Sequence, residues 1–274
     1  MRRYALPLLI AAILLAAGCS GSSSTTPRVA AAPTAVSGTV SVLGTTALDG
    51  QGDLKLELVD VSKQPNVVVT SKSQTVTALP VDFSLPFAAG AINGSDLYVL
   101  SASMSDTQRK YVTPIQYPVL TRGNAAQISV QLKPLPTAGE QALAGYEALK
   151  ARIGGLKYTQ GDQSKVGMSR GWQVFRDTGG KVVFVRELED AGNKGFTSTE
   201  IAYRNDKPWV VVQSRSAARG QKPNLVERAG WDAEGTLVLH ERSANGTTTQ
   251  LDGSNARGLY ADAESMLKRA GAGK

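Results

Sequence analysis

The first half of the chain alternates apolar and polar side chains with the period of a β-strand. From Val36 to Leu132, apolar residues occupy every second position in short runs, and turn residues such as Asp49 to Gly52 separate the runs. A period of two places one set of side chains in a core and the other in solvent. The regular spacing is typical of an immunoglobulin-like β-sandwich. The expected strands are 36–42, 54–58, 67–76, 81–87, 98–104, 111–113 and 128–132.

The second half repeats the strand period with longer runs and stronger hairpin signals. Between Trp172 and Leu251, turn residues such as Asp232 to Gly235 recur at regular intervals. Asn245-Gly246 is the strongest two-residue hairpin signal. This spacing predicts an antiparallel meander of about six or seven strands.

Two helical patterns flank the meander. Thr137 and Glu140 have the spacing of a capping box, and an apolar period near 3.6 follows until Gly154. A second apolar face near the C-terminus predicts a closing helix that ends at Gly271. The apolar positions are Ala142, Tyr146, Leu149 and Ile153 in the first helix and Leu259, Tyr260, Ala263, Leu267 and Ala270 in the second.

These patterns together predict the fold class. We expect a mainly β protein in which an N-terminal immunoglobulin-like β-sandwich is followed by a second antiparallel β-meander domain with flanking helices. Pro134 and Pro136 mark the boundary between the two. The expected domains are therefore the sandwich at 35–134 and an α+β domain at 137–272.

The N-terminal segment has the layout of a cleavable secretory signal. Arg2 and Arg3 precede an apolar run that is too short to span a bilayer, which needs about 20 residues. The Ala-Ala-Gly-Cys sequence that ends at Cys19 resembles the bacterial lipobox. The resemblance implies that residues 1–18 are removed, that the thiol of Cys19 carries diacylglycerol, and that its new amino group takes an acyl chain such as palmitate. The alternative is an ordinary signal peptide with an unmodified cysteine.

Residues 19–34 are small, polar and interrupted by proline, so we expect a flexible lipidated tether. Cys19 is the one cysteine in the sequence, and the fold therefore relies on packed cores rather than disulfides. The formal net charge is +7, and removal of Arg2 and Arg3 leaves 7 − 2 = +5. Because the basic residues are scattered, the sequence carries no nucleic-acid footprint.

Several segments of the first half carry a family resemblance. Its landmarks are LVDVS at 58–62, a Pro-Val-x-Phe sequence at 80–83 and PVLTRG at 118–123. With VSGTVSVL, LYVLSASMS and ISVQLKP, they are similar in order to the YbaY/YscW-type lipoprotein domain, which is related to the lipoprotein chaperone (pilotin) of type III secretion systems. The resemblance covers residues 35–134, and we recognise no family in the C-terminal half.

The resemblance implies a β-sandwich lipoprotein that faces the periplasm and has no known catalytic residues. In the pilotin branch, such a domain binds an outer-membrane secretin and guides it. The sequence does not indicate which branch this chain follows.

His240 is the one histidine of the chain. Strand alternation places Leu237 and Leu239 on one face and His240 on the other with Val238 and Arg242. A catalytic triad needs a nucleophile and a carboxylate beside the base, and zinc needs three or four close ligands. Because neither set is evident around His240, we predict no catalytic residue, no cofactor and no metal site.

Acidic residues gather at two places. Four positions near residue 50 have the spacing of a calcium loop, but Leu54 stands where that loop needs glycine, so we expect a hairpin turn. Glu187 and Glu189 share one strand face before Asp190, which makes either a carboxylate pair or, more simply, a solvated face. The residues with calcium-loop spacing are Asp49, Gln51, Asp53 and Asp60.

Aromatic and arginine residues recur along the expected strands of the second half. The aromatic side chains either line a ligand groove or form the core, which is the commoner arrangement. The arginines either form a basic face toward headgroups or glycan, or cover a solvated outer face. The sets are Trp172, Phe175, Phe184, Phe196, Tyr203, Trp209, Trp231 and Tyr260, and Arg176, Arg186, Arg204, Arg215, Arg228 and Arg242.

We therefore expect a non-enzymatic bacterial outer-membrane lipoprotein with a binding or chaperone-like role in the periplasm. By resemblance to other lipoproteins, Ser20 favours the outer membrane, because an aspartate at this position retains many lipoproteins in the inner membrane. The expected partners are the membrane, through the lipid anchor, and another envelope protein, but not nucleic acid. The alternatives are an envelope enzyme that acts on peptidoglycan or lipid through the C-terminal domain, and a purely structural envelope module.

Overall fold

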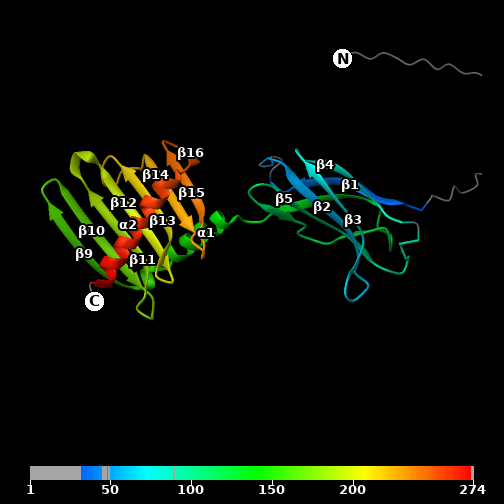
Figure 1. The fold of residues 1–274 in the computed structure, drawn as a ribbon, viewed down its shortest axis with the longest axis horizontal. Helices are drawn as coiled ribbons and strands as arrows, with labels where there is room; N and C mark the ends of the chain where they lie inside the picture. The colour runs from blue at the N-terminus through cyan, green and yellow to red at the C-terminus, as the bar shows by residue number, and fades with distance from the viewer. Residues whose placement is uncertain (1–31, 45–47, 49, 89, 273–274) are drawn as a thin grey trace, which may run out of the picture. The chain divides into compact units, whose positions relative to one another are not determined.

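The computed structural model describes residues 32–44, 48, 50–88 and 90–272. The described chain is mainly β, and it forms two eight-stranded sheets with helices beside the second (Figure 1). The predicted fold class is confirmed. The predictions for residues 1–18, Cys19 and Asp49 lie outside the described residues.

The first sheet folds over as an immunoglobulin-like sandwich. Its strand order is β3-β2-β5-β6-β8-β1-β4, with β7 paired to β5. Strand β8 runs parallel to β1 and then pairs with β6, so it joins the two layers. The strands are β1 Ala35–Val42, β2 Gly52–Asp60, β3 Val67–Val76, β4 Val81–Pro86, β5 Tyr98–Ser105, β6 Lys110–Val112, β7 Tyr117–Val119 and β8 Gln127–Pro134.

The core of the sandwich follows the predicted alternation. Leu54, Leu56 and Leu58 of β2 are fully buried, whereas Lys55 between them is exposed. Gly38 permits the close approach of β1 to β8, because its φ is 153° and an added Cβ would lie 1.7 Å from the carbonyl oxygen of Ile128. The alternation did not predict β7, which has three residues and is too short to show a period.

The second sheet is an antiparallel meander in which all eight strands lie in chain order. The sequence predicted six or seven strands. The additional strand β9 is exposed at almost every position, so it has no apolar period to detect. The strands are β9 Lys157–Lys165, β10 Met168–Arg176, β11 Val182–Asp190, β12 Phe196–Arg204, β13 Lys207–Ser216, β14 Leu225–Trp231, β15 Leu237–Ala244 and β16 Thr247–Gln250.

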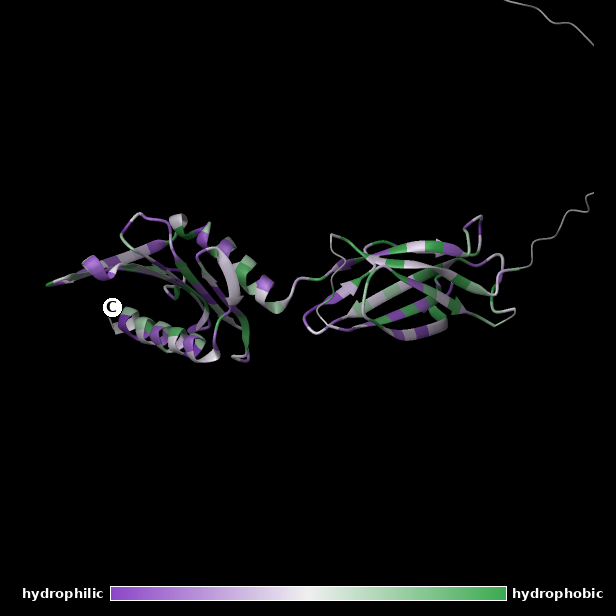
Figure 2. Cartoon of the chain, turned by 90° about the horizontal axis from the view of Figure 1, so that it is seen from above, coloured by the Kyte–Doolittle hydropathy of each residue, from purple (hydrophilic) through white to green (hydrophobic). Residues whose placement is uncertain are grey.

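Two helices cover opposite faces of the meander (Figure 2). Helix α1, Ala138–Lys150, begins with the predicted capping box of Thr137 and Glu140. Its residues Ala142 and Tyr146 pack on one face of the sheet, and a short 3-10 helix, Ile153–Gly155, follows. Helix α2, Gly253–Ala272, packs on the other face through Ala256, Leu259 and Ala263.

A β-bulge breaks the predicted alternation around His240. Gly230 pairs with Leu239, but the next residue, Trp231, pairs with Leu237. Leu237 therefore packs with the α2 side of the sheet, whereas Val238 and Leu239 pack with the α1 side. The prediction that Leu237 and Leu239 share a face was wrong, because one extra residue in β15 shifts the register.

Candidate binding sites

The α1 face of the meander contains a closed network around Glu200. Tyr146 donates to Oε2 of Glu200 at 2.5 Å, and Nζ of Lys150 lies 2.6 Å from the same oxygen. Arg186 donates to Oε1 through Nε at 3.0 Å and also approaches it through Nη2 at 2.9 Å. Both oxygens of this carboxylate are thus occupied by charged or hydroxyl donors from α1 and β11.

The pKa values of this network follow from its contacts. Burial alone would raise the pKa of Glu200, but the hydrogen bonds from Lys150 and Tyr146 and the charges of Lys150 and Arg186 outweigh burial and lower it. Burial and the neighbouring carboxylate raise the pKa of Tyr146. Glu200 is therefore an ionised cross-link between helix and sheet, and both of its oxygens already accept hydrogen bonds.

The face of the sheet that packs against α2 changes from apolar to polar along the length of its strands. One row is apolar and lies in the core with α2. The next rows on the same face are polar and extend beyond the apolar row, since side chains two residues apart share a face. The apolar row is Val174, Val185, Ile201, Val211 and Ala229, and the neighbouring row is Trp172, Glu187, Thr199, Gln213, Glu227 and Arg242.

Two adjoining cavities lie between these polar rows and α2, and we call them together the α2 cleft. One has a volume of about 690 Å³ and the other about 380 Å³. Both are lined by Arg170 and Glu187 of the sheet and by Met266 and Arg269 of the helix. The larger cavity has more polar walls, whereas Trp172 and two valines line the smaller one.

Glu187 lies at the junction of the two cavities with 8% of its surface exposed. Its oxygens are 3.8 Å from Nε of Arg170 and 3.8 Å from Nη2 of Arg269, which is too long for hydrogen bonds. Arg170 instead binds Glu189 at 2.5 Å. Burial raises the pKa of Glu187 by more than the two arginines lower it. This carboxylate is therefore buried without the donors that Glu200 has.

Further polar side chains of the α2 cleft are held in place by one another. Nη2 of Arg215 donates to Oε1 of Gln213 at 2.8 Å, and Nε2 of Gln213 donates to Oγ1 of Thr199 at 3.2 Å. Nearby on the same face, Arg242 lies 3.5 Å from the buried Glu227. These groups form a preorganised polar wall.

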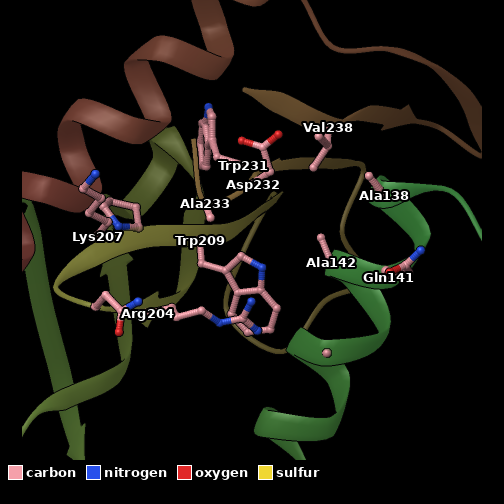
Figure 3. A pocket seen from close by; sticks show the side chains of 13 residues that line it. Ala138, Gln141, Ala142, Arg204, Lys207, Trp209, Trp231, Asp232, Ala233 and Val238 are labelled. Carbon is pink, nitrogen blue, oxygen red and sulfur yellow. The ribbon is translucent and has the colours of Figure 1, made fainter. Parts of the chain in front are cut away.

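A third cavity, of about 460 Å³, lies on the α1 side of the sheet. Figure 3 shows Trp209 and Arg204 beside each other at its wall, with the Arg204 guanidinium 4.0 Å from the centre of the indole ring. Gly145 of α1 leaves room for that ring, because an added Cβ would lie 2.7 Å from Cη2 of Trp209. The indole and guanidinium are thus fixed as a stacked pair.

The sandwich offers a different kind of site, which is an open seam between β3 and β4. These strands end the strand order of the sheet, and no backbone ladder joins them in the described part of the chain. Side chains bridge them instead: Thr70 donates to the carbonyl of Pro86 at 3.1 Å, and Lys72 donates to that of Ser84 at 3.2 Å. Side-chain hydrogen bonds alone therefore close the seam, and on this side β3 has no strand partner in the described chain.

The landmarks of the family resemblance serve the fold. The backbone N–H of Leu97 donates to Oγ of Ser62 in LVDVS at 2.6 Å. Oγ1 of Thr121 in PVLTRG donates to the carbonyl of the adjacent Asp96 at 2.8 Å. Ser62 and Thr121, which are far apart in the sequence, thus hold one loop.

The structure separates the other candidates. Nδ1 of His240 is 2.9 Å from Nε2 of Gln250 across the β15-β16 pair. Asp53 and Asp60 lie seven residues apart along β2, which rises about 3.3 Å per residue, so they cannot hold one ion. Asp60 instead pairs with Lys63 at 2.9 Å, which lowers the pKa of Asp60.

The predicted aromatic and arginine sets divide between the faces of the sheet. Phe175, Phe184, Tyr203 and Trp231 are buried in core, as expected. The arginines do not form one basic face, because Arg186 and Arg228 pair with acids on the α1 side while Arg242 pairs on the α2 side. Glu187 and Glu189 do share a face, but they line the α2 cleft rather than open solvent.

Sequence reasoning did not find the other groups of the α2 cleft. They come from three strands and α2, and each alone looks like an ordinary surface residue. The sequence signal that was present is strand pairing. Once the hairpins are aligned, Arg170, Thr199 and Gln213 lie in neighbouring rows of the sheet, whereas Arg269 belongs to the helix. These four residues line the α2 cleft.

Two searches of the described residues gave negative results. None of their helices is long and apolar enough to cross a membrane. Within residues 32–44, 48, 50–88 and 90–272, no group of three or more His, Cys, Asp or Glu side chains is arranged to hold a metal ion.

Comparison with known proteins concerns the first half of the chain. Among solved structures, the chain is similar to an alternative pilotin from the type II secretion system of Vibrio cholerae, with 20% identity, a TM-score of 0.34, and coverage of 37% of this chain and 96% of that chain. No curated protein matches the chain. The model of the type III secretion system lipoprotein chaperone family (YscW) matches residues 31–132. The predicted resemblance is therefore confirmed, since residues 31–132 match the model of this family.

Proposed function

We propose that the protein is a non-enzymatic lipoprotein that acts as a chaperone-like binding protein for an outer-membrane secretin. The observation that carries the proposal is the match of residues 31–132 to the secretion-system lipoprotein chaperone family. The sandwich contacts the partner, and the lipid anchor on Cys19 holds the protein in the outer membrane with its folded part in the periplasm.

The seam between β3 and β4 is the proposed contact surface. A partner segment that adds to a free strand edge gains backbone hydrogen bonds, and nearby apolar side chains give specificity. Val67 and Val68 at the start of β3 are 43% and 51% exposed, which is unusual for large apolar residues in a strand. They would pack against apolar side chains of the added strand.

A double variant tests this surface. Val67→Asp with Val68→Asp places charges where the added strand packs, and we expect at least a tenfold loss of secretin recovered with the protein, since 1.4 kcal/mol is about tenfold in affinity. Ile115→Asp is the matched control, because Ile115 is 64% exposed and lies outside β3 and β4. Equal recovery with the double variant and the control would exclude the seam as the contact surface.

The anchor is tested separately. Cys19→Ser removes the thiol that would take diacylglycerol, so we expect the protein to move from the membrane fraction to the soluble periplasm. Three acyl chains bind a membrane firmly whereas a single chain binds it only marginally. Unchanged membrane retention would refute the anchor, and recovery of the acylated protein with the inner membrane would refute the outer-membrane placement.

The rival function is an enzyme that acts on peptidoglycan or lipid through the C-terminal half. It would need a deep cleft with clustered carboxylates, or His240 beside a nucleophile. Glu187 and Glu189 do line one cleft, whereas the ring of His240 is bonded to Gln250. We expect no release of soluble fragments from purified peptidoglycan and no fatty acid release from phospholipid vesicles. Turnover that is lost in Glu187→Gln would favour the enzyme.

A further inference from the structure

The α2 cleft is a feature that neither the family match nor the proposed function explains. It lies in the C-terminal half, beyond residue 132, where the family match ends. Figure 2 shows α2 lying along the inner side of the curved meander sheet, where the cleft is found.

The buried polar groups of the cleft are costly to the fold. Glu187 and Thr199 are 8% and 6% exposed, at positions where the residue two places along the same strand belongs to the apolar core. Burial of a polar group without full hydrogen bonding costs about 1–3 kcal/mol, so a purely structural sheet would be more stable with apolar residues there. Thr199 already accepts a hydrogen bond from Gln213, so Glu187 is the group whose hydrogen bonds a ligand would complete.

The spaces between Glu187 and the two arginines indicate which polar groups a ligand would need. Its oxygens accept only, whereas Arg170 and Arg269 donate only, and each guanidinium is 3.8 Å away. A hydroxyl group that enters each gap donates to the carboxylate and accepts from a guanidinium. Two neighbouring hydroxyls on one ligand therefore match the two gaps on either side of Glu187.

The net charge of the larger cavity argues against a strongly charged ligand. Its walls contain four basic residues and three acidic residues, a balance of 4 − 3 = +1. Arg170 is already paired with Glu189. A neutral ligand rich in hydroxyls suits this wall better than a phosphate or a multiply charged peptide. The charged residues are Arg170, Lys194, Arg215 and Arg269, and Glu187, Glu189 and Asp262.

The smaller cavity supplies an apolar platform beside these polar groups. Trp172 lines it together with Met266, and its indole lies against Gly161 of β9, where an added Cβ would come within 2.5 Å of the ring. A sugar ring has an apolar face of C–H groups and a rim of hydroxyls, and an aromatic ring beside planar polar side chains complements both. We propose that the α2 cleft binds a saccharide, with Trp172 against the ring and Glu187, Arg170 and Arg269 on its hydroxyls.

The test uses the full chain in a detergent without a sugar headgroup. We titrate it with maltotriose and with the trimer of N-acetylglucosamine, and follow binding by calorimetry and tryptophan fluorescence. Saturable binding of either probe is the expected result. Binding of both indicates recognition of hydroxyls alone, whereas binding of only the acetylated trimer indicates a glycan that carries amide groups.

Variants connect binding to the cleft. Glu187→Gln and Arg269→Gln are each expected to weaken binding about tenfold, the loss of one charge-assisted hydrogen bond. Glu241→Gln, on the opposite face of the sheet, is the matched control and should bind as the unaltered protein does. Far-ultraviolet circular dichroism confirms that each variant is folded.

Three outcomes would overturn the proposal. They are the absence of saturation with both trisaccharides up to about 10 mM, equal affinity of Glu187→Gln and the unaltered protein, and binding of phosphate or glycylglycine that depends on Glu187 while the sugars do not bind. None of these measurements involves the secretin, so failure here leaves the proposed function of the sandwich intact.

Discussion

Glu187 and Glu200 lie on opposite faces of the same pair of strands, with side chains that are 11% and 12% exposed, but their hydrogen-bond partners differ. Glu200 receives hydrogen bonds from Tyr146, Lys150 and Arg186, and its pKa is lowered. Glu187 has two guanidinium groups at 3.8 Å without a hydrogen bond, and its pKa is raised. A satisfied carboxylate stabilises a fold, and an unsatisfied one at the junction of two cavities indicates a site kept open.

Removal of Glu200 is expected to lower the free energy of unfolding most. In Glu200→Ala, Lys150 and Arg186 lose their shared partner, and we expect the free energy of unfolding to fall by about 2–3 kcal/mol, less than the ~3–5 kcal/mol of a fully buried pair because both cations are partly exposed. Trp172, Trp209 and Trp231 all belong to the second half of the chain, so tryptophan fluorescence during urea unfolding reports on the meander.

The pH dependence of this loss has a defined sign. The folded pKa of Glu200 lies below its usual value of 4.5, so its contribution is present above pH 4.5 and disappears as the pH falls through the folded pKa. The difference between the unaltered protein and Glu200→Ala should therefore be larger at pH 7 than at low pH. A loss below about 0.5 kcal/mol at pH 7 would place Glu200 with the weak surface pairs.

Tyr146→Phe removes one donor from the Glu200 network and leaves the others. Tyr146 is 1% exposed, and its hydroxyl donates to a charged oxygen, so we expect a loss of about 1.5 kcal/mol in the free energy of unfolding. The double variant Tyr146→Phe with Glu200→Ala measures their coupling in urea unfolding. Fully additive losses would show that the two side chains act independently, contrary to the network.

The helices and most strands were predictable because their apolar period survives in the folded chain. Thr137 and Glu140 form the predicted capping box, and Leu54, Leu56 and Leu58 are buried as alternation requires. Strand β9 was not predictable, because an edge strand held by backbone pairing alone leaves both faces exposed and imposes no pattern on its sequence.

The candidate site was less predictable than the fold. The shared face of Glu187 and Glu189 follows from strand alternation, but their burial depends on α2, which comes some seventy residues later in the chain and brings Arg269 over them. Contacts between residues so far apart in the sequence leave no local pattern from which they could be predicted. The bulge at Trp231 likewise depends on how two strands pair rather than on either strand alone.

The Glu187→Gln substitution is expected to change stability in the opposite direction from Glu200→Ala. The folded pKa of Glu187 lies above its usual value of 4.5, so the ionised side chain lowers stability as the pH rises from 4.5 through the folded pKa. We expect the variant to match the unaltered protein near pH 4 and to be more stable by about 1 kcal/mol above the folded pKa. Urea unfolding at pH 4 and pH 8 measures both. Destabilisation at pH 8 would mean that Glu187 contributes to folding rather than to a site.

Glu241→Gln gives the smallest effect and shows what burial adds. Glu241 lies on the α1 side as Glu200 does, and it also faces an arginine, with Nη1 of Arg228 at 3.5 Å, but 42% of its side chain is exposed. Water screens both charges and an exposed pair is worth at most about 0.5 kcal/mol, so urea unfolding should scarcely change. A loss as large as that of Glu200→Ala would mean that any carboxylate on this sheet matters equally. The contrast between Glu187 and Glu200 would then reflect position in the sheet rather than burial and hydrogen bonding.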